Sequence, residues 1–185
     1  MEVKEKYDVV IIGGGIGGLM CAWRLMENRP DLSVLILERG KALEDRRCPI
    51  LEGKVKKCIK CKPCAIMEGM AGAGAFSDGK YNITTEYGGW LPSVMDEKEV
   101  LDYIHQADRI LMEYMPDDEL KTLCLRYDLH MQQAEVKHLG TDANYGTMLK
   151  MIEKISDKVQ IETLANVTDV DKETHKIIFT RNKTE

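Results

Sequence analysis

The sequence predicts an α/β protein whose first unit is a strand, a helix and a second, parallel strand. Three observations support this. Four β-branched residues, Val9 to Ile12, run directly into a glycine-rich turn over residues 13–18. Residues 19–26 follow without Gly or Pro and favour a helix. A second apolar run over residues 33–37 then ends at Glu38.

Strand, glycine turn and helix in this order form the fingerprint of a Rossmann-like dinucleotide-binding domain. Gly13 permits the tight turn, Gly15 leaves room for a diphosphate, and Gly18 lets the helix pack against the strand. The N–H groups at the helix N-terminus then face the phosphates. Glu38 lies 20 residues after Gly18, where an acid is expected to bind the ribose hydroxyls. Its charge disfavours the 2′-phosphate of NADP.

Apolar periodicity and turn residues predict the elements beyond this βαβ unit. The first later helix has Asp96 as its N-cap and an apolar face that begins with Val100. The predicted elements are, in order, helices over 96–115 and 117–127, a strand over 129–139, a helix over 145–155, and two strands over 159–170 and 176–181 joined by a hairpin turn at 171–174.

The predicted sheet is apparently incomplete. Only residues 8–12 and 33–37 form strong candidates for buried strands, and a doubly wound domain needs further parallel strands. We therefore expect the front part of a longer protein. An open sheet edge would favour self-association or pairing with a missing C-terminal half.

Composition restricts the class of protein further. The chain has 185 residues, of which 44% are hydrophobic and 31% are charged, as in a folded globular protein. The net charge of −5 offers no basic field for nucleic acid or an anionic membrane. Neither a signal sequence nor a membrane span is evident, so a cytoplasmic location is expected.

Four cysteines, Cys48, Cys58, Cys61 and Cys64, form the pattern C-x9-C-x2-C-x2-C. Four thiolates could bind Zn²⁺ or a [4Fe–4S] cluster, although the spacing matches neither common pattern. Two further interpretations stay open, a redox dithiol and a basic loop with reduced, unligated thiols. Lysines interleaved with the cysteines would lower the thiol pKa values. Cys21 and Cys124 lie in helical patterns and are expected in the core.

Several segments together resemble the bacterial FAD-dependent dehydrogenases, which are flavoproteins of the glutathione-reductase-like class. The glycine turn and Glu38-Arg39-Gly40 are shared with many flavoproteins and NAD enzymes. Met70-Ala71 stands where a glycine-rich pair is expected. The more specific segments are Cys64-Ala65-Ile66, Gly69-Met70-Ala71-Gly72-Ala73-Gly74-Ala75-Phe76-Ser77-Asp78-Gly79-Lys80 and His138-Leu139-Gly140-Thr141-Asp142.

This resemblance implies an FAD site that combines the glycine turn with Glu38 and Arg39. It also implies that Gly72, Gly74 and Ser77 lie near the diphosphate and the flavin ring, where Ser77 and Lys80 could donate hydrogen bonds. His138 and Asp142 are candidates to face the substrate. The implied segments are an FAD-binding βαβ unit over 1–47, a Cys- and Gly-rich cofactor-proximal segment over 48–95, and a helical segment with the start of a β-meander over 96–185.

The function expected from these features is that of an FAD-dependent oxidoreductase. Its partner would be a small-molecule substrate or an electron donor or acceptor protein, with NAD(P) as a possible co-substrate. No residue is a convincing general acid or base, so the catalytic residue is unknown. The chain alone is expected to be inactive. The alternatives are a non-catalytic nucleotide-binding or metal- or Fe–S-binding electron-transfer module and an NAD-binding dehydrogenase domain.

Overall fold

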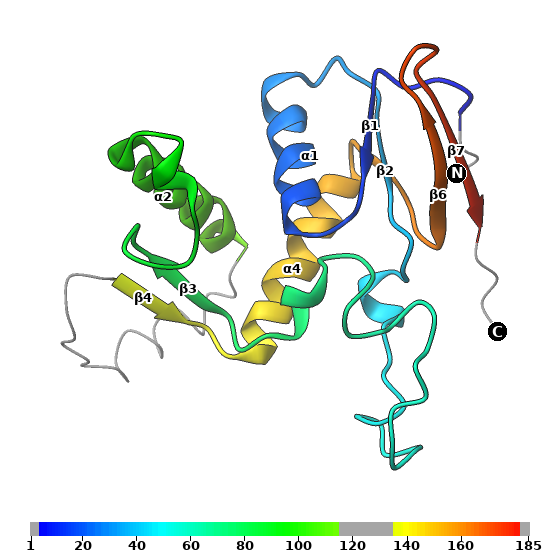
Figure 1. The fold of residues 1–185 in the computed structure, drawn as a ribbon, viewed down its shortest axis with the longest axis horizontal. Coiled ribbons are helices and arrows are strands. Elements are labelled where there is room, and N and C mark those ends of the chain that lie inside the picture. Colours follow the sequence, from blue (N-terminus) through cyan, green and yellow to red (C-terminus); the bar gives the residue numbers. More distant parts are fainter. Residues whose placement is uncertain (1–3, 115–134, 182–185) are drawn as a thin grey trace. The chain divides into compact units, whose positions relative to one another are not determined.

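The computed structural model of the chain describes residues 4–114 and 135–181. The chain divides into two compact units, Met1–Gly74 with Ile152–Glu185, and Ala75–Met151 (Figure 1). The limits of these units differ from those of the three segments expected from the sequence. The segment limits stay a prediction. The helix expected over 117–127, with Cys124, lies outside the described residues.

A three-stranded parallel sheet forms the centre of the first unit. β1 (Val9–Ile12) pairs with β2 (Val34–Leu37), and β2 pairs with β5 (Gln160–Glu162). The helix α1 (Ile16–Asn28) connects β1 to β2, which confirms the predicted βαβ unit. All four side chains of β2 are buried, as its uninterrupted apolar sequence predicts for a strand covered on both faces.

An antiparallel hairpin packs on this sheet. It consists of β6 (Ala165–Asp171) and β7 (Lys176–Arg181), and Asp171 Oδ1 accepts hydrogen bonds from two backbone N–H groups of its turn. Figure 1 shows α1 and this hairpin on opposite sides of β1 and β2. The core between sheet and hairpin contains Leu35, Leu37 and Ala165, with Tyr7, Val10, Val167, Ile177 and Phe179 packed against them.

The third parallel strand corrects a sequence prediction. Residues 159–170 were expected to form one strand, but they form β5 and the start of β6, which belong to different sheets. Leu164 breaks the extended chain between them with a φ of 56°. β5 has only three residues, two of them polar, so no apolar run identifies it as a sheet strand.

In the second unit, β3 (Lys80–Ile83) pairs antiparallel with β4 (Glu135–His138), and α2 (Glu97–Glu113) contacts β3. α4 (Thr141–Ser156) begins in this unit, four residues before the predicted start, and ends in the first. Three short 3-10 helices complete the described structure, η1 (Leu43–Asp45), η2 (Ala73–Phe76) and η3 (Leu91–Ser93). Among the described residues, no helix has the length and apolar character needed to cross a membrane.

The N-cap of α2 provides a test of this unit. Asp96 Oδ1 accepts hydrogen bonds from Lys98 N at 3.0 Å and from Glu99 N at 3.3 Å, as its position predicts. We expect Asp96→Ala to lower the free energy of unfolding by about 1 kcal/mol, because two N–H groups lose their acceptor. Asp102→Ala, at an exposed position within the same helix, is the control. Equal effects of the two substitutions in denaturant unfolding would contradict the capping role.

Candidate functional site

The glycine turn between β1 and α1 has two positions that only glycine fits. Gly13 has a φ of +104°, and its N–H donates to Leu37 O at 2.8 Å. A Cβ at Gly18 would overlap Gly13 O and approach Ile11 Cγ2 at 3.3 Å. Gly15 differs, because a Cβ there would meet no atom closer than Gly72 Cα at 4.0 Å. The space beside Gly15 is therefore open.

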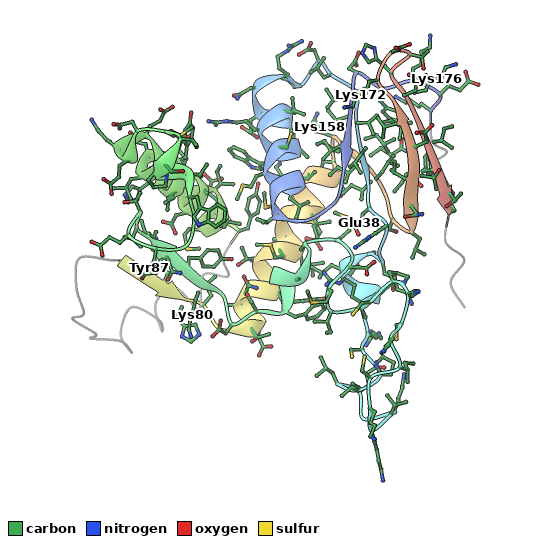
Figure 2. The ribbon with its side chains drawn as sticks, viewed as in Figure 1. Glu38, Lys80, Tyr87, Lys158, Lys172 and Lys176 are labelled. Carbon is green, nitrogen blue, oxygen red and sulfur yellow. The ribbon has the colours of Figure 1, made fainter. Side chains whose placement is uncertain are left out.

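Glu38 holds the turn from the C-terminal end of β2 (Figure 2). Its side chain is buried, and Oε2 accepts a hydrogen bond from Gly14 N at 2.7 Å while Oε1 accepts one from Gly40 N at 2.8 Å. Each carboxylate oxygen has a second lone pair that a ribose hydroxyl could use. The carboxylate therefore shapes the turn in addition to any contact with a ligand.

Residues 69–72 run directly against this turn. Ala71 N donates to Gly14 O at 2.8 Å, and Met70 N donates to Lys41 O at 3.0 Å. A Cβ at Gly72 would come within 3.3 Å of Gly15 Cα. The second glycine-rich segment, expected near the diphosphate, thus lies beside the first at Gly72.

Ala71 is one of the two residues that stand where the family resemblance leads us to expect glycine. Its φ is +66°, a left-handed conformation that favours glycine, and its side chain is buried. The glycine expected at this position of the family would adopt that conformation without strain.

Arg46, which sequence reasoning missed, binds this segment from its other side. It follows η1 and is 4% exposed, and its guanidinium donates to four backbone carbonyl oxygens within residues 65–72. No sequence pattern distinguishes the buried Arg46 from the exposed Arg47 beside it in this polar stretch. The acceptors are Ala65 O, Ile66 O, Met70 O and Gly72 O, at 2.6–2.9 Å.

Two further predicted site residues, Arg39 and Gly74, are exposed. The side chain of Arg39 is exposed, and its Nε lies 3.0 Å from Glu68 Oε2. A Cβ at Gly74 would meet nothing within 4 Å. Contact of either residue with a cofactor stays a prediction.

The Ser-Asp-Gly-Lys and His-Leu-Gly segments come together in the second unit. Leu139 N donates to Gly79 O at 3.1 Å, and His138 Nε2 lies 3.4 Å from Asp78 Oδ2. Lys80 Nζ lies 3.2 Å from the same oxygen, and its hydrogen bond holds the pKa of Asp78 below the usual value. Ser77 Oγ accepts a hydrogen bond from Gly79 N at 3.2 Å. Asp142 is exposed in the first turn of α4.

The second unit also contains a cavity of about 360 Å³, bordered by β3, α2 and the chain between them. Asp108 borders it and pairs with Lys137, and its Oδ1 has no hydrogen-bond partner among the described residues. Burial, with a smaller effect of the nearby Asp108, raises the pKa of Tyr81, whose hydroxyl donates to Asn144 Oδ1 at 2.7 Å. The apolar wall includes Ile83, Val100, Ile104 and Leu111.

Metal binding by the four clustered cysteines stays a prediction. In the described part of the chain, no three His, Cys, Asp or Glu side chains are arranged to hold a metal ion. Cys58 is exposed on a loop, whereas Cys48, Cys61 and Cys64 are half-buried, and none of them forms a disulfide. Cys21 is exposed on α1, so its predicted place in the core is wrong.

Comparison with known proteins supports a Rossmann-like dinucleotide-binding domain at the beginning of the first unit. Residues 11–43 match the NAD(P)-binding Rossmann-like domain. Thiamine thiazole synthase of Coprinopsis cinerea is 54% identical over 35 residues, which are 19% of this chain and 11% of that protein. The FAD-containing monooxygenase EthA of Mycolicibacterium smegmatis is 49% identical over 37 residues, 20% of this chain and 8% of that protein.

A solved structure extends the likeness to most of the chain. The 3-ketosteroid-delta4-(5alpha)-dehydrogenase of Rhodococcus jostii RHA1, in complex with 4-androstene-3,17-dione, has a TM-score of 0.54 and 16% identity. The match covers 97% of this chain and 43% of the dehydrogenase chain, so this chain spans less than half of that protein. The predicted Rossmann-like α/β fold is therefore confirmed, and part of the chain is similar to a protein named as an FAD-containing monooxygenase.

The strained residue beside the turn gives a prediction about stability. Ala71→Gly should raise the free energy of unfolding by roughly 1 kcal/mol, since glycine adopts a positive φ without a Cβ clash. Ala75→Gly is the matched control at a buried alanine without a positive φ, and it should lower stability instead. Destabilisation by both substitutions in urea would show that Ala71 is not strained.

Thiol labelling tests the arrangement of the cysteines. In reduced protein, Cys58 should react with a maleimide faster than Cys48, Cys61 or Cys64, because it is the exposed thiol of the four. Mass spectrometry of partially labelled protein would give the order. Equal protection of all four thiols, released by a chelator, would instead establish the four-thiolate site predicted from the sequence.

Proposed function

We propose that this chain supplies the FAD-binding part of an oxidoreductase. The observation that carries the proposal is the open space at Gly15, between the turn that Glu38 holds and the segment that contains Gly72. A ligand that needs close contact with the backbone would explain glycine at this position, where a Cβ would have only Gly72 Cα, at 4.0 Å, as a neighbour. A diphosphate is such a ligand.

The beginning of α1 supports binding of an anion at this space. α1 has 13 residues, and Gly15 at its N-cap offers no side chain to accept hydrogen bonds from the first turn. The first turn also contains no acidic residue. Its N–H groups and the positive end of the helix dipole are thus available to phosphate oxygens.

Glu38 supports an adenosine ribose at the other end of the site. Its carboxylate follows β2, the position from which the acid of this fold contacts the ribose hydroxyls. The backbone N–H groups of Gly14 and Gly40 hold it in place. A negative charge fixed in this position repels a 2′-phosphate, so NADP is not the ligand we propose.

FAD is preferred over NAD because an FAD-containing monooxygenase is 49% identical over 37 residues and because the sequence beyond Cys64 resembles FAD-dependent dehydrogenases. When bound, FAD supplies the hydride or electron transfer. The protein's residues bind the adenosine diphosphate and orient it. NAD is the second candidate, because the matching domain is described as NAD(P)-binding. The substrate is a small molecule or an electron-transfer protein.

Gly15→Val tests the proposed site. Val is compatible with the backbone of this residue, whose φ is −70°, and its Cβ would lie 4.0 Å from Gly72 Cα, an ordinary contact, so the fold should persist. The same side chain would occupy the place of the diphosphate. We expect the affinity for FAD to fall by at least about tenfold, as measured by fluorescence titration of the purified protein.

The control is Gly89→Ala, which adds a Cβ to open space at a glycine that belongs to neither the turn nor the segment over 69–72, and it should leave FAD affinity unchanged. Parallel titrations with NAD and NADP distinguish the candidates. Wild-type affinity for FAD in the Gly15→Val protein would place the cofactor elsewhere. Tighter binding of NAD than of FAD by the wild-type protein would favour the second candidate.

A further inference from the structure

We propose that Arg46 is a positioning residue of the dinucleotide site, which it completes by fixing the direction of the peptide groups in residues 69–72. The inference rests on the proposed function, and it adds a residue that neither the fingerprint nor the comparisons assign. Arg46 lies in the first unit together with the glycine turn and the segment that it binds.

The contacts of Arg46 are directed at the backbone of one segment. Nη1 donates to Met70 O at 2.6 Å and to Gly72 O at 2.7 Å, while Nε and Nη2 donate to Ala65 O and Ile66 O. The planar guanidinium presents donors in a fixed fork, so it can hold carbonyl groups that are separated along the chain. These bonds tie the two ends of residues 65–72 to one side chain.

The orientation of the carbonyl groups determines where the opposite N–H groups point. In a trans peptide the C=O and the following N–H point in opposite directions. Because Arg46 binds Met70 O, the N–H of Ala71 points away from the guanidinium, and it donates to Gly14 O at 2.8 Å. The bond to Gly72 O turns the N–H of Ala73 away from Arg46 in the same manner.

The packing around Arg46 is equally specific. Gly69 has a φ of +126°, and a Cβ there would lie 2.7 Å from both Arg46 Cδ and Lys41 O. A Cβ at Gly40 would overlap the backbone of Gly69. The guanidinium therefore reaches its acceptors because the chain at Gly69 carries no side chain. Arg46 and Gly69 form one arrangement that brings Gly72 beside Gly15.

The two buried charges of the site have separable roles. Glu38 contacts Gly14 and Gly40 and lies at the proposed ribose position, whereas Arg46 holds the segment next to the proposed diphosphate. Loss of Arg46 should therefore weaken ligands that contain a diphosphate and spare those that contain only the nucleoside. A general loss of folding would weaken both.

The experiment compares Arg46→Met with Arg47→Met in the purified protein. Arg47 is adjacent in sequence, but its side chain is 72% exposed and lies 3.9 Å from Glu52. Calorimetric or NMR titration would measure the affinities for FAD, ADP and adenosine. Arg46→Met should lower the affinities for FAD and ADP by about tenfold or more and change that for adenosine less than about twofold. Arg47→Met should change none of them.

Arg46→Lys refines the test. Lysine keeps the charge but presents three donors from one atom, so it cannot reproduce the fork. The ADP affinity of the Arg46→Lys protein should lie between those of the wild type and the Arg46→Met protein. Amide hydrogen exchange gives a readout without nucleotide. The Ala71 N–H should exchange faster in Arg46→Met than in Arg47→Met, because the Met70–Ala71 peptide group that carries this N–H is no longer held through Met70 O.

The possible outcomes distinguish the positioning role of Arg46 from the proposed binding of FAD. Unchanged exchange at Ala71 or unchanged ADP affinity in Arg46→Met would overturn the role of Arg46, whatever the cofactor is. Equal losses for ADP and adenosine would reduce Arg46 to a general structural residue. If the wild-type protein bound neither FAD nor ADP, both the proposed function and the role of Arg46 in binding would be overturned. Faster exchange at Ala71 in Arg46→Met would then still show that Arg46 fixes residues 69–72.

Discussion

The close approach of residues 69–72 to the glycine turn is the constraint on which the rest of the site depends. It brings two segments that are more than 50 residues apart in sequence to contact distance, with Gly72 against Gly15 and Ala71 bonded to Gly14. Backbones can approach this closely only where side chains are absent. The turn limits substitution at Gly72, because a Cβ there would come within 3.3 Å of Gly15 Cα, whereas a Cβ at Gly15 would lie 4.0 Å from Gly72 Cα.

Two buried side chains, one acidic and one basic, stabilise this approach, and both form hydrogen bonds with backbone groups. Glu38 accepts from N–H groups on the side of the turn, and Arg46 donates to carbonyl groups on the side of the second segment. A buried charge is tolerated when hydrogen bonds replace its lost hydration. The same bonds fix the turn and the second segment on either side of Gly15, where we propose that a phosphate-containing ligand binds. Glu38 and Arg46 therefore stabilise the local fold and also shape the proposed binding site.

The sequence was sufficient to predict elements with a strong local pattern. The βαβ unit, the Asp96 cap and the hairpin turn at Asp171 are confirmed, because each depends on residues close together in the chain. β5 and Arg46 could not be predicted in this way. β5 is a strand because of its neighbour β2, and Arg46 is buried because distant carbonyl groups surround it. Cys21 shows the reverse error, since a small residue within a helical pattern can face solvent.

The measurement that tests the account most directly is the identification of the cofactor in the purified protein. Visible absorbance would detect a flavin, and mass spectrometry of the compound released on denaturation would identify it. The account predicts FAD, bound reversibly and with a stoichiometry of one per chain after incubation with excess FAD. A protein that shows no flavin absorbance and takes up none from such a solution, while folded as described, would contradict it.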